Sequence, residues 1–171
     1  WIAIVGPAVE PCELEIPYEH LAVAARVPGD RSVIVYGTVL PWLAVCRHAP
    51  YLVRPGEGYA DVFARMLNAQ RRDLARLRSQ ADILIWAGDF NQSLDGPVRG
   101  ASQKGREAVR ACLDELGLTA WNATAPHARE GLCAIDLICG PAEHIPRAQG
   151  RIPPEHDDVK MSDHAGYWVD L

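Results

Sequence analysis

Three short motifs place acidic, amide and imidazole side chains at the ends of apolar segments or within them: Asp89 and Asn91, then Asp136, then Asp163 and His164. Carboxylates are hard oxygen ligands of the kind that divalent metal ions prefer. An imidazole can donate to a phosphoryl oxygen or accept a proton. Together these side chains are parts from which a metal-dependent phosphoester hydrolase can be made.

The first of these motifs comes directly after a strand-like run. Residues 82–88 are apolar without alternation after Asp82, which is typical of a buried strand. Asp89 then lies at the edge of the sheet, where a ligand crevice can form. If the backbone stays extended, Asn91 points to the same side as Asp89. An Asx-type turn that leaves the strand explains the same residues, so the tetrapeptide alone leaves both interpretations open.

The other two motifs combine an imidazole with acidic neighbours. Asp163 and His164 are adjacent, and Ser162 before them is expected to order the turn. Asp136 stands inside an apolar strand-like run, where a carboxylate is costly unless it is paired. It is therefore a candidate partner for His164, since a carboxylate favours the protonated ring. An exposed position on an alternating edge strand is the alternative for Asp136.

Alternating strand and helix patterns surround the three motifs. Strands are predicted at 1–5, 20–27, 31–40, 82–88, 134–139 and 165–171, with a weaker candidate at 143–148. The turn sequence at 28–30 predicts a hairpin. Helices are predicted at 58–80 and from Ser102, as the cap, to a stop at Gly117. Residues 6–17 are expected to be irregular, and 151–158 to form an exposed loop. The pattern predicts one α/β domain, 1–171.

Composition limits the classes of protein that fit. The 171 residues are 49% apolar and 23% charged, enough for a buried core. The formal charge of −5 provides no overall basic field for nucleic acid, although a local basic patch stays open. The five cysteines form no C-x-x-C pair, and reduced thiols favour a cytoplasmic protein. No segment has the composition of a membrane span, and the oligomeric state is left open.

The chain resembles the endonuclease/exonuclease/phosphatase superfamily in three motifs that occur in the family's order: Gly88-Asp89-Phe90-Asn91, Ile135-Asp136-Leu137-Ile138 and Ser162-Asp163-His164. The superfamily includes DNase I-like nucleases, apurinic-site endonucleases, sphingomyelinases and inositol-polyphosphate phosphatases. The resemblance runs from about Trp1 to the end of the chain. It implies a four-layer sandwich of two mixed β-sheets flanked by helices, from which this chain would lack the first strands.

The resemblance also implies a role for each candidate residue. Asp89 would orient or deprotonate the attacking water, and Asn91 would position the water or the phosphate. His164 would contact the scissile phosphate while Asp136 holds its other ring nitrogen. Asp163, and with it Asp89, would lie near a divalent ion, Mg²⁺ or Mn²⁺. The implied substrate is a phosphoester of nucleic acid, a phospholipid or a small phosphate ester, attacked in line by water.

Two departures from the family pattern bear on activity. The family's early strands carry an asparagine and then a glutamate that is its principal metal ligand, and no residue after Trp1 is assigned either role. Val39 stands where many members have a histidine. Because valine cannot donate a proton, the donor to the leaving group must come from elsewhere. The remaining histidines are isolated and are given low priority: His20, His48, His127 and His144.

These observations predict a metal-dependent phosphoesterase whose activity is weak or absent in the 171-residue chain. The chain is expected to begin inside a domain, because it opens at Trp1 in a strand-like run. The alternative is a non-catalytic remnant or binding module that keeps the fold.

Overall fold

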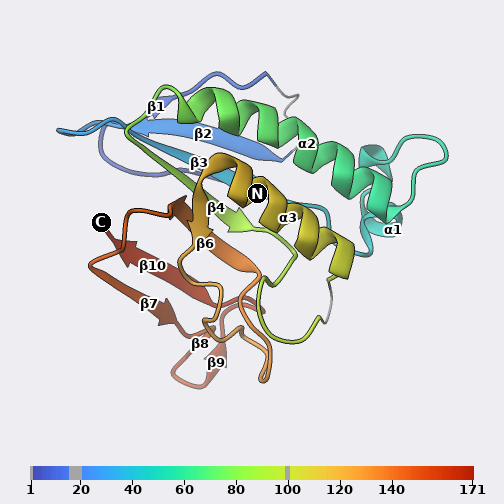
Figure 1. Cartoon of the computed structure of the whole chain (residues 1–171). Helices are drawn as coiled ribbons and strands as arrows, with labels where there is room; N and C mark the ends of the chain where they lie inside the picture. Colours follow the sequence, from blue (N-terminus) through green and yellow to red (C-terminus); the bar gives the residue numbers. More distant parts are fainter. Residues whose placement is uncertain (1, 16–20, 99–100) are drawn as a thin grey trace.

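The computed structural model describes residues 2–15, 21–98 and 101–171, and its central element there is a six-stranded mixed sheet (Figure 1). Its strands are, in spatial order, β1 (Glu10–Pro11), β2 (Ala22–Val27), β3 (Val33–Val39), β4 (Ile83–Asp89), β6 (Asp136–Pro141) and β5 (Leu118–Ala120). β3 and β4 are parallel, and the other neighbours are antiparallel. The mixed sheet confirms the predicted α/β class.

Two smaller sheets follow in the last quarter of the chain. One pairs β7 (Ala148–Ile152) with β10 (Gly166–Asp170), and the other pairs β8 (Glu155–His156) with β9 (Val159–Lys160). β10 also contacts β6 of the large sheet. This contact brings the segment that precedes β10 to the sheet edge where the acidic motifs lie.

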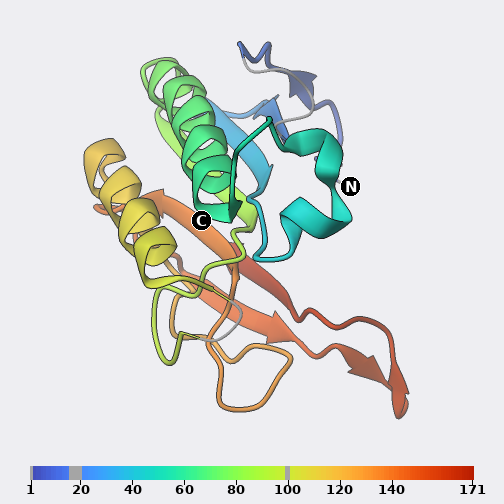
Figure 2. The same ribbon diagram turned by 90° about the vertical axis from the view of Figure 1, so that its right-hand side faces the viewer.

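Two long helices lie over the same face of the large sheet (Figures 1 and 2). α2 (Tyr59–Arg78) begins where the Gly58 N–H donates to Asp61 Oδ2 at 2.9 Å. α3 (Gln103–Leu116) begins at Ser102, whose hydroxyl accepts from the Gly105 N–H at 2.9 Å. It ends at Gly117, which takes a left-handed φ of 64°. Both predicted helices and the predicted cap and stop of the second are therefore confirmed.

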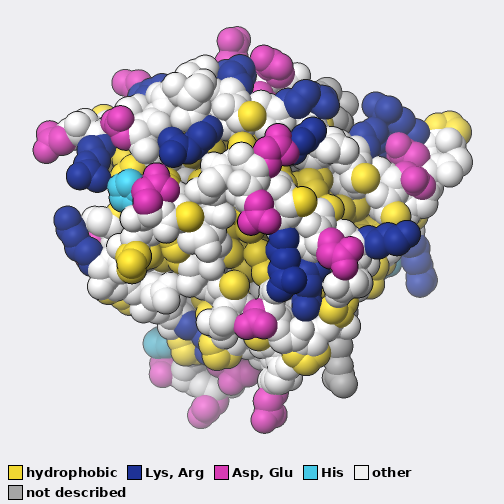
Figure 3. Space-filling model, in the orientation of Figure 1, with side chains coloured by type: hydrophobic (Ala, Val, Ile, Leu, Met, Phe, Trp, Pro, Cys, Tyr) yellow, Lys and Arg dark blue, Asp and Glu magenta, His cyan; other side chains and the backbone are white. Residues whose placement is uncertain are grey.

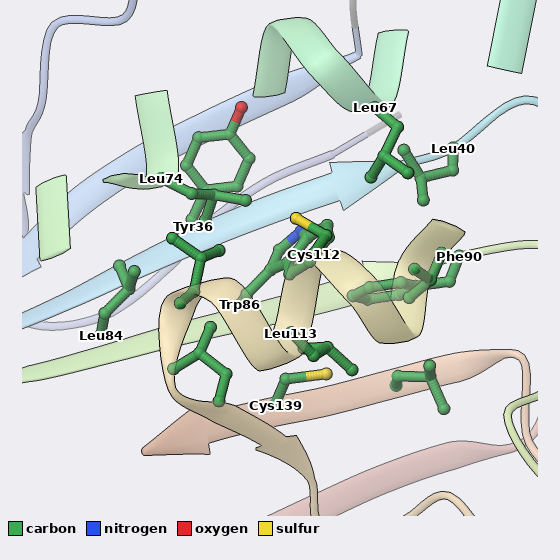
Figure 4. Close-up of a cluster of buried hydrophobic side chains, with 14 of the residues drawn as sticks. Tyr36, Leu40, Leu67, Leu74, Leu84, Trp86, Phe90, Cys112, Leu113 and Cys139 are labelled. Atoms are coloured by element: carbon green, nitrogen blue, oxygen red, sulfur yellow. The ribbon is translucent and has the colours of Figure 1, made fainter. Parts of the chain in front are cut away.

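The core lies between this face and the two helices (Figure 4). Alternate residues of β3, Ile34 and Tyr36, are fully buried toward the helices. Trp86 and Phe90 form an aromatic pair with ring centroids 4.6 Å apart. Burying one large aliphatic side chain stabilises the fold by about 1.5–3 kcal/mol, and burying a large aromatic side chain stabilises it at least as much. The apolar stripe of α2 is buried: Phe63, Leu67, Leu74 and Leu77 lie in this core, and Met66 lies in a second cluster with Val45 and Leu52.

The opposite face of β3 carries three valines. Val33, Val35 and Val39 are half-buried, in alternation with the fully buried positions. Gly37 lies between them, and a Cβ there would be 2.9 Å from Cγ2 of Ile2. The N-terminal segment therefore lies against this face.

That contact corrects the prediction for the start of the chain. Residues 2–5 form no strand, and Trp1 lies outside the described residues. An apolar run becomes a strand only where a neighbour supplies hydrogen bonds, and local pattern cannot show whether one exists. The segment 6–17, which was predicted to be irregular, instead contains the two-residue strand β1, and this strand pairs with β2. The predicted hairpin of β2 and β3 is confirmed, although His20 lies outside the described residues.

Two predictions near the C-terminus are also wrong. The weak strand candidate 143–148 is irregular except for Ala148, which begins β7. Residues 151–158 are exposed as expected, but they contain the end of β7 and all of β8 instead of a plain loop. The turn of the β8–β9 hairpin uses left-handed backbone at Asp157 and Asp158, which aspartate tolerates better than most residues.

Charges of both signs are interspersed over the face that carries α2 and α3 (Figure 3). Arg71 of α2 pairs with Glu115 of α3 at 2.6 Å, and Arg76 pairs with Asp73 at 2.9 Å. Such mixed charge does not form a single-sign field on this side. None of the helices in residues 2–15, 21–98 and 101–171 is both long and apolar enough to cross a bilayer.

Candidate active site

The strand β4 ends beside the start of β6 (Figure 1), and a carboxylate residue stands on each strand at this point. The antiparallel register sets Asp89 directly opposite Asp136, and both residues are half-buried. Like charges directly opposite on neighbouring strands destabilise a sheet, and partial burial adds to the cost. Burial, followed by the charge of Asp136, raises the pKa of Asp89 to about 6. Packing alone therefore does not favour this arrangement.

Gly88 allows Asp89 to reach this position. Its backbone has a φ of +138°, a conformation that residues with a side chain rarely adopt. A Cβ at Gly88 would lie 2.0 Å from the carbonyl oxygen of Thr38 on the neighbouring strand. The Leu40 N–H then donates to the carbonyl oxygen of Asp89 at 2.8 Å. The motif therefore needs a glycine at this position, because β3 and β4 approach each other closely there.

His164 reaches the same place from the segment before β10. Its Nδ1–H donates to Asp136 Oδ2 at 2.8 Å, the pairing that the sequence predicted. Burial lowers the pKa of His164, but the hydrogen bond to Asp136 and the nearby carboxylates outweigh burial, so that its pKa is raised overall. Burial raises the pKa of Asp136 despite the opposing effect of His164. The Ser162 hydroxyl accepts from the His164 N–H at 3.0 Å and orders the turn.

Asn91 lies beside Asp89 through a turn. Its φ of 49° means that the backbone does not stay extended, so the condition for two side chains on one strand face is not met. The Asn91 N–H donates to Asp89 Oδ1 at 2.9 Å, which is the Asx-type turn weighed as the alternative. Its side-chain amide donates to the carbonyl oxygen of Leu40 at 2.9 Å. The same tetrapeptide therefore makes the turn and presents the acid.

A cavity of about 620 Å³ opens beside these groups. Residues from all three motifs line it, although Asp136 itself is not one of them. The connection after β3 and the segment between β5 and β6 complete its walls. The lining residues are Val39, Trp42, His48, Asp89, Asn91, Ser93, Pro97, His127, Arg129, Leu132, Cys133, Ile135, Asp163 and His164.

The donor atoms of one group of residues could hold a metal ion. Oxygens of Asp89 and Asp136 and a ring nitrogen of His164 all lie within 4.8 Å of one another. Two carboxylates with open space beside them fit a divalent ion that keeps several waters. Asp163, which the sequence also proposed as a ligand, is exposed and lines the cavity but is outside this group.

The early glutamates do not join the site in the part of the chain that the structure describes. Glu10 and Glu13 line a separate cavity together with Arg26 and Arg76. Glu15 pairs with Arg76 at 3.4 Å.

His127 was given low priority from the sequence, yet it lines the cavity. It is only 8% exposed, and its ring centroid is 6.1 Å from that of His164. Burial lowers the pKa of His127, with the charge of Asp136 opposing it. No spacing pattern links His127 to the three motifs, because it comes from the loop before β6. Arg129 of the same loop and His48, at the end of the short helix Val45–His48, also line the cavity, and no spacing pattern links them to the three motifs either.

Comparison with known proteins gives a clear result only at the level of structure. No protein-family model matches the chain, and no curated protein matches it in sequence. The fold is similar to that of the 3′ phosphatase NExo from Neisseria, solved with a product DNA hairpin, at a TM-score of 0.67 and 17% identity. That alignment covers 88% of this chain and 64% of NExo.

Two family structures from other bacteria are also similar. An endonuclease/exonuclease/phosphatase family protein from Leptotrichia buccalis aligns at a TM-score of 0.51 and 18% identity, over 88% of this chain and 52% of its own. One from Beutenbergia cavernae aligns at 0.52 and 18%, over 97% of this chain and 44% of its own. The chain thus spans less than two thirds of the length of these proteins. Over that length, it has the fold of the endonuclease/exonuclease/phosphatase proteins.

Proposed function

We propose that this chain is a metal-dependent phosphoesterase domain, or the larger part of one, in which water attacks a phosphoester. The observation that carries the proposal is the convergence of Asp89, Asp136 and His164 within 4.8 Å beside a cavity. The three residues come from distant parts of the chain, and two of them are like charges set opposite each other. Such a cluster does not stabilise the fold, but it suits a site that binds a cation and a phosphate.

The geometry supports a distinct role for each residue. A pKa of about 6 leaves Asp89 ionised at neutral pH but basic enough to take a proton from, or orient, the attacking water. Asp136 occupies Nδ1 of His164, which leaves Nε2 for a phosphoryl oxygen. The raised pKa of His164 favours the protonated ring, which stabilises developing negative charge. Asn91 is proposed to position the water or the phosphate from the cavity wall.

The proposed metal ion is Mg²⁺ or Mn²⁺, held by Asp89 and Asp163 directly or through water. When bound, it would neutralise charge on the phosphoryl oxygens. We expect the 171-residue chain to be weakly active or inactive, because no glutamate is among the described residues that line the cavity. Asp163 is also exposed and can stay hydrated, so we expect it to bind the ion more weakly than a buried carboxylate would.

The first substrate to test is a DNA end with a 3′ phosphate, because the similar structure NExo is a 3′ phosphatase bound to a DNA product. The net charge of −5 weakly disfavours a protein that coats long stretches of DNA. RNA, phospholipid and inositol-phosphate substrates complete the panel.

The test is Mg²⁺- or Mn²⁺-dependent release of product from this panel. Asp89→Ala and His164→Ala are each expected to lower kcat/KM by about 10²–10⁴-fold, the usual effect of removing a general base or acid. Asp157→Ala, on the exposed turn of the β8–β9 hairpin, is the matched control and should keep the wild-type rate. Wild-type rates in either active-site variant would refute the assignment. Metal binding with no turnover of any substrate would favour the non-catalytic binding module.

A further inference from the structure

His127 lies in the loop between β5 and β6, which hydrogen bonds join to neighbouring segments. Its N–H donates to the carbonyl oxygen of Leu132 at 3.0 Å, and its carbonyl oxygen accepts from Arg151 at 3.3 Å. Arg151 Nε and the hydroxyl of Tyr167 both donate to the carbonyl oxygen of Pro126 at 2.9 Å. The imidazole is therefore presented from a loop that is tied to β7 and β10, not from a free surface segment.

The hydrogen bonds of His127 define which ring nitrogen carries the proton. The backbone N–H of Arg129 donates to Nδ1 at 2.9 Å, so Nδ1 is an acceptor. The neutral ring then carries its proton on Nε2. This Nε2 is buried and has no hydrogen-bond partner within the described residues. The ring is thus a donor whose acceptor is missing from the protein.

A buried donor without an acceptor costs about 1–3 kcal/mol, so its presence in a native structure calls for an explanation. Eight residues in the described part of the chain have such a buried atom. Of these, His127 alone lines the cavity beside Asp89 and His164. The position of the orphaned donor in the proposed site points to a ligand atom as its acceptor.

We propose that His127 Nε2–H donates a hydrogen bond to a phosphoryl oxygen of the substrate, as a second imidazole donor beside His164. This inference rests on the proposed phosphoesterase function. The two ring centroids are 6.1 Å apart, and each hydrogen bond spans about 2.8 Å, so oxygens of one phosphate can reach both rings. Arg129, which also lines the cavity, adds a positive charge nearby. His127 would thus supply a hydrogen-bond donor to a site in which Val39, at the position of a histidine in many family members, supplies none.

The test measures the binding of inorganic phosphate in the presence of Mg²⁺, by titration calorimetry and by histidine ¹H–¹⁵N spectra. The wild-type spectra should show His127 as the neutral tautomer protonated on Nε2, with the Nε2 signal shifted at saturating phosphate. His127→Ala should raise the phosphate dissociation constant about tenfold, the usual loss for a hydrogen bond to a charged acceptor. His127→Gln keeps an amide donor on a side chain of similar reach and should recover part of the loss.

His144→Ala is the matched control. This histidine also has a buried, unpartnered nitrogen, but it lines a different cavity, which contains neither Asp89 nor His164. Its phosphate affinity should equal that of the wild type. Phosphate affinity within twofold of wild type in His127→Ala, or a His127 tautomer protonated on Nδ1, would overturn the inference and leave the phosphoesterase proposal intact. A wild-type chain that neither binds phosphate nor turns over any substrate would remove both.

Discussion

The two ends of one strand pair differ sharply. Where β4 and β6 run through the middle of the sheet, Trp86 lies opposite Cys139, and both are fully buried under the helices. Three residues further along β4, Asp89 lies opposite Asp136, at the edge of a cavity. Both pairs belong to the same antiparallel ladder. Apolar contact stabilises the first end, whereas electrostatic repulsion and desolvation of two carboxylates destabilise the second.

This difference separates the residues that stabilise the fold from those proposed to act on a substrate. His164 offsets part of the repulsion through its hydrogen bond to Asp136. The Asp89 carboxylate accepts from the backbone N–H of Asn91, but burial and the charge of Asp136 outweigh this bond, and its pKa stays raised. The acidic end is therefore the part of the strand pair that a bound cation would stabilise, and substitutions at the two ends should have opposite effects on stability.

The largest expected effect is at the apolar end. Trp86→Ala should lower the free energy of unfolding by about 3–5 kcal/mol, because it opens a large cavity under both helices. Urea denaturation would measure the loss. Trp168→Ala is the matched control, since Trp168 is 45% exposed and should cost far less. Equal losses in the two variants would mean that the buried strand pair is not the centre of the core.

A smaller effect of opposite sign is expected at the acidic end. The folded-state pKa of Asp89, about 6, lies above its ordinary value of 3.8, so ionised Asp89 destabilises the folded state at neutral pH. Asp89→Asn should raise the free energy of unfolding at pH 7 by about 1–3 kcal/mol. As pH falls from 6 to 4, wild-type Asp89 becomes protonated in the folded state first, and the advantage of the variant should shrink. Denaturation curves at pH 7, 5.5 and 4 would show this, and an advantage that grows toward pH 4 would contradict the raised pKa.

The smallest expected effect comes from the metal. If Mg²⁺ binds the acidic end, a concentration of ten times its dissociation constant should stabilise the chain by about 1.4 kcal/mol, and a chelator should reverse the shift. Asp89→Asn should abolish this stabilisation, whereas Cys139→Ala, at the other end of the same pair, should leave it unchanged. Thermal unfolding with and without Mg²⁺ provides the measurement. A shift of the same size in Asp89→Asn would place the ion elsewhere.

Local pattern was enough to predict most of the elements that position the site. The apolar spacing of α2, the Ser102 cap and the Gly117 stop of α3 each depend on neighbours within a few residues. The apolar run that becomes β4 is equally local. The predicted strand at 1–5 failed because a strand needs a partner, and that partner is not encoded nearby. The short helix α1 (Val45–His48) and the 3₁₀ turn at Pro50–Leu52 have no pattern long enough to recognise.

The site shows the same division. The sequence by itself determined which residue types stand at the strand ends, and it paired Asp136 with His164 on chemical grounds. Only the tertiary structure decided that Asp89 lies opposite Asp136, that Asn91 leaves the strand in a turn, and that His127 reaches the cavity. The physical reason is that side-chain type and periodicity act over a few residues. Cross-strand register and the docking of a distant loop depend on how the whole sheet assembles.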